Sequence, residues 1–293
     1  MWNHKVRIKK PYNYMSMLER LATDPLVSVR IEQASVKVPI PQQNKIATVS
    51  FSESNDQVSA FIESSGEKDT VLHRLSQIFW WERDLQRVAD HFTETKLSTL
   101  FDCFFGTPLV SEFEEYGCLM KTIIHQQLNL KFAHTLTLRF VHTYGEQKDG
   151  VWFYPTPEIV SYLTVEELRN LQFSERKAQY VIDTSRLIIE GKLDLQSLPE
   201  KEDEEIIEEL MKIRGIGRWT AENYLMFALG RMDHLPAADI GIQNAMKSLY
   251  QLKQKPTKDE IIELATTWTP FRTYAALYLW LSIERPQYVQ KGR

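Results

Sequence analysis

A short glycine turn between two helical patterns constrains this fold more than any other feature of the sequence. Residues 202–210 place apolar side chains on one side of a helix, Gly215-Ile216-Gly217 follows, and a second helical pattern begins at Arg218. Two glycines around one apolar residue allow a backbone turn that a Cβ would obstruct. The exposed N–H groups at the start of the second helix then favour a phosphate. We therefore expect a helix–hairpin–helix with an anion site, although a Gly-x-Gly before a helix can also be a plain connector.

The first 95 residues are rich in β patterns. Alternating or β-branched runs predict strands at residues 5–9, 27–31, 36–39 and 46–51. Helical spacing predicts one helix at 14–21 and another from 68 to 82. We therefore predict an α+β domain over residues 1–95, in which helices back a small antiparallel sheet. Trp80 and Trp81 are expected to pack in its interior.

Residues 96–293 are expected to form an all-α region, which makes the fold class mainly α. A Ser or Thr three residues before a Glu is typical of a capping box. This pattern predicts helix starts at Ser111, Thr164 and Thr257. Gln126 to Asn129 interrupt the helical pattern before a further helix at 131–144. Thr269-Pro270 predicts a cap and a first-turn proline for a final helix that Pro286 ends.

Composition excludes several classes of protein. The 293 residues are 43% hydrophobic and 25% charged, which is typical of globular chains of about two domains. No apolar run is long enough for a membrane span, and the start of the chain lacks the apolar core of a secretion signal, so we expect an intracellular protein. Cys103 and Cys118 are too few for a four-cysteine iron–sulfur cluster and form no Cys-x-x-Cys pair, so we expect reduced core thiols.

The net charge of −4 argues against a protein that binds DNA through a broad basic surface. DNA binding through a few local contacts stays possible, because backbone N–H groups at hairpins and helix starts hold phosphates without adding formal charge.

An ordered set of motifs surrounds the hairpin. His125-Gln126-Gln127 and Phe173 to Ala178 precede it, and Leu235-Pro236-Ala237-Ala238-Asp239 and Trp268 to Ala276 follow it. This set resembles the alkylpurine DNA glycosylases of the AlkA type, within the helix-hairpin-helix-Gly/Pro-Asp superfamily. The resemblance covers nearly the whole chain, because Pro11-Tyr12 and Asp24-Pro25-Leu26 are similar to the N-terminal α+β domain of that family.

The resemblance implies how the hairpin region meets DNA. Gly215 and Gly217 would present amides to a phosphate, with Arg218 beside them. Gln127 falls where a side chain fills the gap left by a flipped nucleotide, although the AlkA type itself has an aliphatic residue there. Similar proteins hold a monovalent cation through main-chain carbonyls at this hairpin. In this chain those carbonyls would belong to Met211, Ile213 and Ile216.

The resemblance also implies that Asp239 is the catalytic carboxylate. As a purine N-glycosidic bond breaks, the sugar takes on oxocarbenium character, which a fixed carboxylate stabilises. An alkylated purine is already cationic and leaves as a neutral base, so no general acid is needed. An Asp before residues 240–246 is also a natural N-cap, and the two roles are compatible because a helix start keeps a carboxylate ionised.

Trp219 decides between subclasses. Related bifunctional glycosylases carry a lysine at this point, whose amine forms a Schiff base with the sugar, and an indole cannot do so. Its face suits stacking on a flat cationic base, as does Phe271 where the family places another aromatic. For both residues the alternative is ordinary core packing.

The sequence thus predicts a monofunctional glycosylase that hydrolyses the N-glycosidic bond of alkylated purines, of the 3-methyladenine or 7-methylguanine type. We expect a monomer that acts on damaged double-stranded DNA and requires no cofactor. Two alternatives stay open: a helix-hairpin-helix DNA-binding module without catalysis, and a glycosylase for a different damaged base.

Overall fold

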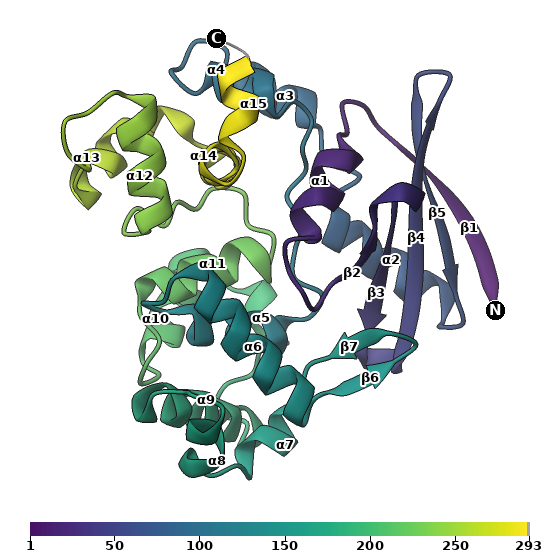
Figure 1. The fold of residues 1–293 in the computed structure, drawn as a ribbon, viewed down its shortest axis with the longest axis vertical. Coiled ribbons are helices and arrows are strands. Elements are labelled where there is room, and N and C mark those ends of the chain that lie inside the picture. The colour runs from purple at the N-terminus through teal and green to yellow at the C-terminus, as the bar shows by residue number, and fades with distance from the viewer. Residues whose placement is uncertain (292–293) are drawn as a thin grey trace.

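The computed structural model describes residues 1–291, and its N-terminal part is built on a five-stranded antiparallel sheet of order β1-β5-β4-β3-β2 (Figure 1). The strands are β1 (Trp2–Ile8), β2 (Ser28–Arg30), β3 (Ser35–Ile40), β4 (Lys45–Ser54) and β5 (Gln57–Ser64). Asn55 and Asp56 join β4 to β5 with φ values of 49° and 59°, the two left-handed residues that a tight hairpin needs.

Four of these strands confirm the sequence patterns, and β5 is the strand that those patterns miss. Val58, Ala60 and Ile62 of β5 are buried, but Phe61 between them is apolar and 40% exposed. The ammonium group of Lys5 lies over its ring, 4.9 Å from the centroid. An apolar residue on the exposed face weakens the alternation that marks a strand.

Two helices, α1 (Tyr14–Leu21) and α2 (Lys68–Phe79), pack with this sheet in one hydrophobic core. The expected end of α2 at residue 82 is wrong. Trp80 adopts a left-handed φ of 54°, and its indole N–H donates to Ser111 Oγ at 2.9 Å. Trp80 and Trp81 are both buried, as expected, and their docking into the interior takes them out of the helix.

The rest of the described chain is mostly helical. Its helices are α3 (Leu85–His91), α4 (Ser98–Cys103), α5 (Glu115–His125), α6 (Leu130–Tyr144), α7 (Pro157–Ser161), α8 (Val165–Asn170), α9 (Glu175–Ile189), α10 (Asp203–Met211), α11 (Arg218–Phe227), α12 (Ile240–Leu249), α13 (Lys258–Leu264), α14 (Arg272–Glu284) and α15 (Pro286–Lys291). Within residues 1–291 no helix is long and apolar enough to cross a membrane.

A small hairpin interrupts these helices, so the expectation of a purely helical second region is wrong at this point. Its strands are β6 (Glu146–Lys148) and β7 (Val151–Phe153). Asp149-Gly150 forms the turn with positive φ at both residues, a recognisable hairpin signal. The hairpin lies beside the N-terminal sheet in Figure 1, and Lys37 of β3 donates to Asp149 O at 2.8 Å.

The observed helix starts show which predicted caps depend on local sequence and which are replaced by tertiary contacts. The capping boxes at Thr164 and Thr257 are confirmed. The one at Ser111 is wrong, because α5 begins at Glu115 and the Ser111 hydroxyl accepts from Trp80 instead. The predicted cap at Thr269-Pro270 is also wrong: α14 begins at Arg272, whose backbone N–H and guanidinium both donate to Asp233.

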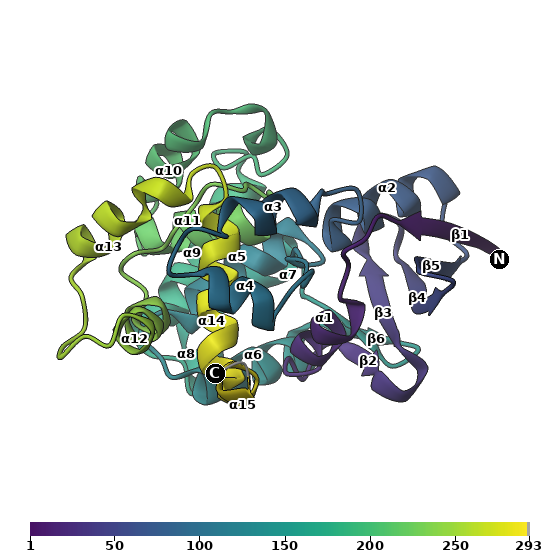
Figure 2. The same cartoon turned by 90° about the horizontal axis from the view of Figure 1, so that it is seen from above.

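Two hydrophobic cores organise the molecule. One contains the sheet, α1 to α4 and the C-terminal helices α12 and α14, and the other contains α5 to α11. The connection from α11 to α12 passes from the second set of helices to the first in Figure 1, and Figure 2 shows from above that the sheet lies to one side of the helices. These two cores do not test the expected division into domains of residues 1–95 and 96–293, which stays a prediction.

Candidate active site

Asp239 lies at the end of the connection between α11 and α12. It is the N-cap of α12, and its Oδ1 accepts the backbone N–H of Ile242 at 3.0 Å. The expected cap is therefore present, and the positive end of the helix dipole faces the carboxylate. The residue is partly exposed.

Two indoles hold the same carboxylate. Trp219, in the first turn of α11, donates its N–H to Oδ2 of Asp239 at 3.1 Å, and Trp280 of α14 donates to Oδ1 at 3.0 Å. With Ile242 N, the carboxylate accepts three N–H donors from three helices. An ionised carboxylate has about four lone-pair positions, so Oδ2 retains capacity for one further positive group.

Trp280 is a site residue that the sequence patterns do not predict. It lies 41 residues from Asp239 along the chain, inside an apolar helix where a tryptophan is unremarkable. Gly241 makes room for this contact, because a Cβ there would lie 2.9 Å from Asp239 Oδ1 and 3.1 Å from Trp280 Cδ1.

Phe271, the other aromatic residue predicted for the base pocket, packs against α3. Phe271 is only 8% exposed, and its ring packs edge-on against His91 of α3 with centroids 5.2 Å apart. His91 in turn bonds through Nε2 to Thr267 O at 3.0 Å. A role for Phe271 in the base pocket stays a prediction.

The glycine turn joins α10 to α11 as the sequence predicts, and its two glycines differ. Gly215 has a φ of +94°, and a Cβ there would lie 2.2 Å from the Tyr180 ring. Gly217 is the exposed N-cap of α11 in extended backbone, and a Cβ there would meet nothing within 4 Å. Ile216 between them is buried in the second core and anchors the turn.

The main-chain carbonyls of Met211, Ile213 and Ile216 are the groups that would hold the expected monovalent cation. Ile213 O accepts from Ile216 N at 3.0 Å, and within residues 1–291 no hydrogen bond reaches the carbonyl oxygens of Met211 and Ile216. Main-chain carbonyls are hard oxygen donors of the kind that alkali cations accept. The residues present therefore fit the expected ion.

Arg218 and Gln127 are the two predicted DNA contacts with side chains. Arg218 donates to both carboxylate oxygens of Glu204, at 2.9 and 3.1 Å, and to Glu222 at 3.1 Å. Gln127 lies exposed in the turn between α5 and α6, with a φ of 57°. Both assignments stay predictions.

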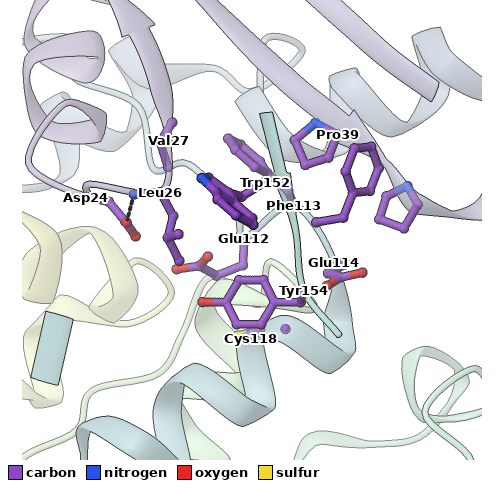
Figure 3. Close-up of a pocket in the computed structure, with 13 residues that line it drawn as sticks. Asp24, Leu26, Val27, Pro39, Glu112, Phe113, Glu114, Cys118, Trp152 and Tyr154 are labelled. Atoms are coloured by element: carbon purple, nitrogen blue, oxygen red, sulfur yellow. Dashed lines mark hydrogen bonds between the residues drawn. The ribbon is translucent and has the colours of Figure 1, made fainter. Parts of the chain in front are cut away.

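A cavity separate from Asp239 lies where the N-terminal part meets α5 (Figure 3). It measures about 30 Å³, enough for about one water molecule and too small for a nucleobase. Lys121 pairs beside it with Asp24 at 2.7 Å and Glu112 at 2.6 Å. Burial raises the pKa of the Glu114 carboxyl to about 8. For Asp24, burial acts to raise the pKa, but the Lys121 ammonium outweighs it and lowers the pKa to about 2. This cavity lies at the contact between the N-terminal part and the helical region, and Asp239 does not line it.

Comparison with known families identifies the superfamily of the chain. Residues 120–271 match the model of the HhH-GPD superfamily base excision DNA repair proteins, and this span contains the glycine turn and Asp239. The chain is 50% identical over 287 residues to Bacillus subtilis YfjP, whose name assigns it provisionally to the DNA-3-methyladenine glycosylases; the match covers 97% of this chain and 100% of YfjP. A second Bacillus subtilis protein, named DNA-3-methyladenine glycosylase, is 33% identical over 181 residues, 60% of each chain.

Two solved structures are also similar. The 3-methyladenine DNA glycosylase from Archaeoglobus fulgidus superposes with a TM-score of 0.84 over 97% of this chain and 99% of its own, at 23% identity, which shows the fold. The Schizosaccharomyces pombe 3-methyladenine DNA glycosylase in complex with abasic DNA is 30% identical, with a TM-score of 0.62 over 68% of this chain and 97% of its own.

Proposed function

Since the chain belongs to the HhH-GPD superfamily of base excision DNA repair proteins, we propose that it is a monofunctional glycosylase that removes alkylated purines from duplex DNA. The observation that carries this proposal is the carboxylate of Asp239, which three N–H donors hold at the start of α12. The named glycosylases among its relatives support the substrate class.

Asp239 would act on the sugar. Breaking the N-glycosidic bond sends its electron pair to the cationic alkylated base, which leaves neutral, and the sugar becomes an oxocarbenium ion. The fixed carboxylate stabilises that positive charge without having to reorganise, and water then adds to the anomeric carbon and loses a proton. The indoles of Trp219 and Trp280 hold the carboxylate in one orientation through this step.

The proposal extends to how the protein engages DNA. The turn at Gly215 to Gly217 would bind a backbone phosphate, with a monovalent cation supplying positive charge at the carbonyls of Met211, Ile213 and Ile216. A flipped nucleotide costs a few kcal/mol to unstack, and Gln127 would fill its place. We further propose that the protein acts as a monomer on cellular DNA.

Substitution of Asp239 tests the catalytic role. Asp239→Asn keeps an acceptor for Ile242 N and Trp280 but removes the charge, so single-turnover excision from methylated duplex should fall by about 10²–10³-fold. Asp84→Asn is the matched control, since Asp84 also caps a helix, α3, and Asn caps equally well. Excision by Asp239→Asn at the parent rate would leave a DNA-binding module as the better reading.

A second experiment tests monofunctional chemistry. Trp219 stands where a Schiff-base lysine would be needed, so treated DNA should carry abasic sites that break only after added alkali. Borohydride should trap no covalent adduct between protein and DNA. A trapped adduct would contradict this part of the proposal.

A further inference from the structure

Helix α9 supports two surface elements that lie far apart in the sequence. One is the turn at residues 126–129 between α5 and α6, and the other is the glycine turn between α10 and α11. Lys177 and Tyr180 are three residues apart on α9 and therefore share one face of it. Lys177 contacts the first turn, and the ring of Tyr180 lies against Gly215 in the second.

Lys177 is a buried cation whose hydrogen-bond acceptors are main-chain carbonyls. It is 9% exposed, and its ammonium donates to Ile123 O at 2.8 Å and to Gln126 O at 3.1 Å. Within the described chain it forms no ion pair with a carboxylate, although a buried charge normally needs one. Its acceptors are carbonyls at the C-terminal end of α5, where the helix dipole favours a cation.

Gln126 continues this contact to the glycine turn. Its side-chain Nε2 donates to Gly215 O at 2.8 Å and to Thr220 Oγ1 at 2.7 Å. The next residue, Gln127, has a left-handed φ of 57°, which is unfavourable for a residue with a Cβ and persists only where its surroundings hold it. The bond from Lys177 to the Gln126 carbonyl and the bonds from the Gln126 side chain to the glycine turn hold the residue just before this position.

We propose that Lys177 and Gln126 form a polar link that holds the Gln127 turn in register with the glycine turn. The link would let one turn bind a phosphate while the other fills the stack at a fixed distance along the same duplex. Lys177 is then a positioning residue that never touches DNA. This inference rests on the proposed wedge role of the Gln127 turn.

The test measures how much more tightly the protein binds a duplex with a gap in its base stack than an intact duplex. Dissociation constants are measured for a duplex with a tetrahydrofuran abasic-site analogue and for the same duplex undamaged. Lys177→Met should weaken binding to the abasic duplex about tenfold and leave the undamaged duplex within about threefold, because only the abasic duplex presents a gap that a correctly placed wedge can fill. Lys177→Arg keeps two donors for the carbonyls and should restore the preference.

Two further variants define the controls. Gln126→Leu breaks the link at its other end, so its effect and that of Lys177→Met should be less than additive in the double variant. It also supplies the test if Lys177→Met folds poorly. Lys131→Met removes an exposed charge beside the same turn and should leave the preference unchanged.

Parallel measurement of Gln127→Ala separates this inference from the wedge itself. If Gln127→Ala lowers the preference and neither Lys177→Met nor Gln126→Leu does, the link is overturned while the wedge stands. If the link variants lower it and Gln127→Ala does not, the link stands and the wedge belongs to a neighbour such as Leu128. If the link variants lose equal affinity for the abasic and the undamaged duplex, the link is overturned.

Discussion

Replacement of Gly217 by valine separates DNA binding from folding at the glycine turn. Gly217 is exposed in extended backbone, with φ −102° and ψ 173°, a conformation that suits a β-branched residue. A Cβ there meets no protein atom within 4 Å. Loss of a glycine N-cap and loss of unfolded-state entropy act in opposite directions, so the free energy of unfolding should change by less than about 1 kcal/mol.

The same substitution should strongly weaken binding to DNA. A side chain at Gly217 would stand between the first N–H groups of α11 and an approaching phosphate. A hydrogen bond to a charged group contributes about 1.5–3 kcal/mol, so its loss should weaken binding roughly 10- to 100-fold. Damaged and undamaged duplexes should lose affinity alike, because phosphate contacts do not read the base.

Gly215→Val is the informative comparison. At a φ of +94° a side chain costs about 1–2 kcal/mol, and contact with the Tyr180 ring at 2.2 Å adds about 1–3 kcal/mol of overpacking. We therefore expect this variant to be destabilised by about 2–5 kcal/mol. Fluorescence anisotropy at one fixed salt concentration and thermal melting measure both quantities. Parent affinity in folded Gly217→Val, or a loss confined to damaged DNA, would refute the phosphate assignment.

Two other predictions concern single side chains. Trp280→Phe removes one of the three N–H donors to Asp239 and should lower single-turnover excision about tenfold, in line with a hydrogen bond to a charged group; an unchanged rate would show that Trp219 and Ile242 suffice. The folded state keeps the Glu114 carboxyl protonated up to a pKa of about 8, whereas the unfolded chain ionises near 4.5, so stability present below pH 4.5 is lost as the pH rises to 8. Glu114→Gln should therefore raise the melting temperature more at pH 8.5 than at pH 5, and an equal effect at both would count against the buried carboxyl.

Much of the scaffold around the site follows from local sequence. The turn at Gly215 to Gly217, the Asp239 cap of α12 and the capping box at Thr164 each depend on residues within about four positions of one another. Such bonds form whenever the backbone turns as those residues favour, so a pattern along the chain suffices to predict them. The resemblance to a known family then indicated which of these local features carries chemistry.

The environment of Asp239 needed the tertiary structure. The base-stacking role expected of the Trp219 face stays a prediction, whereas its N–H donates to the carboxylate. Trp280, which donates to the same carboxylate, lies 41 residues away along the chain. The same holds for Ser111, a good helix cap by pattern that binds Trp80 instead. Side-chain groups of this kind can satisfy their hydrogen bonds in several ways, and which partner they take depends on what the packing of distant helices brings within 3 Å.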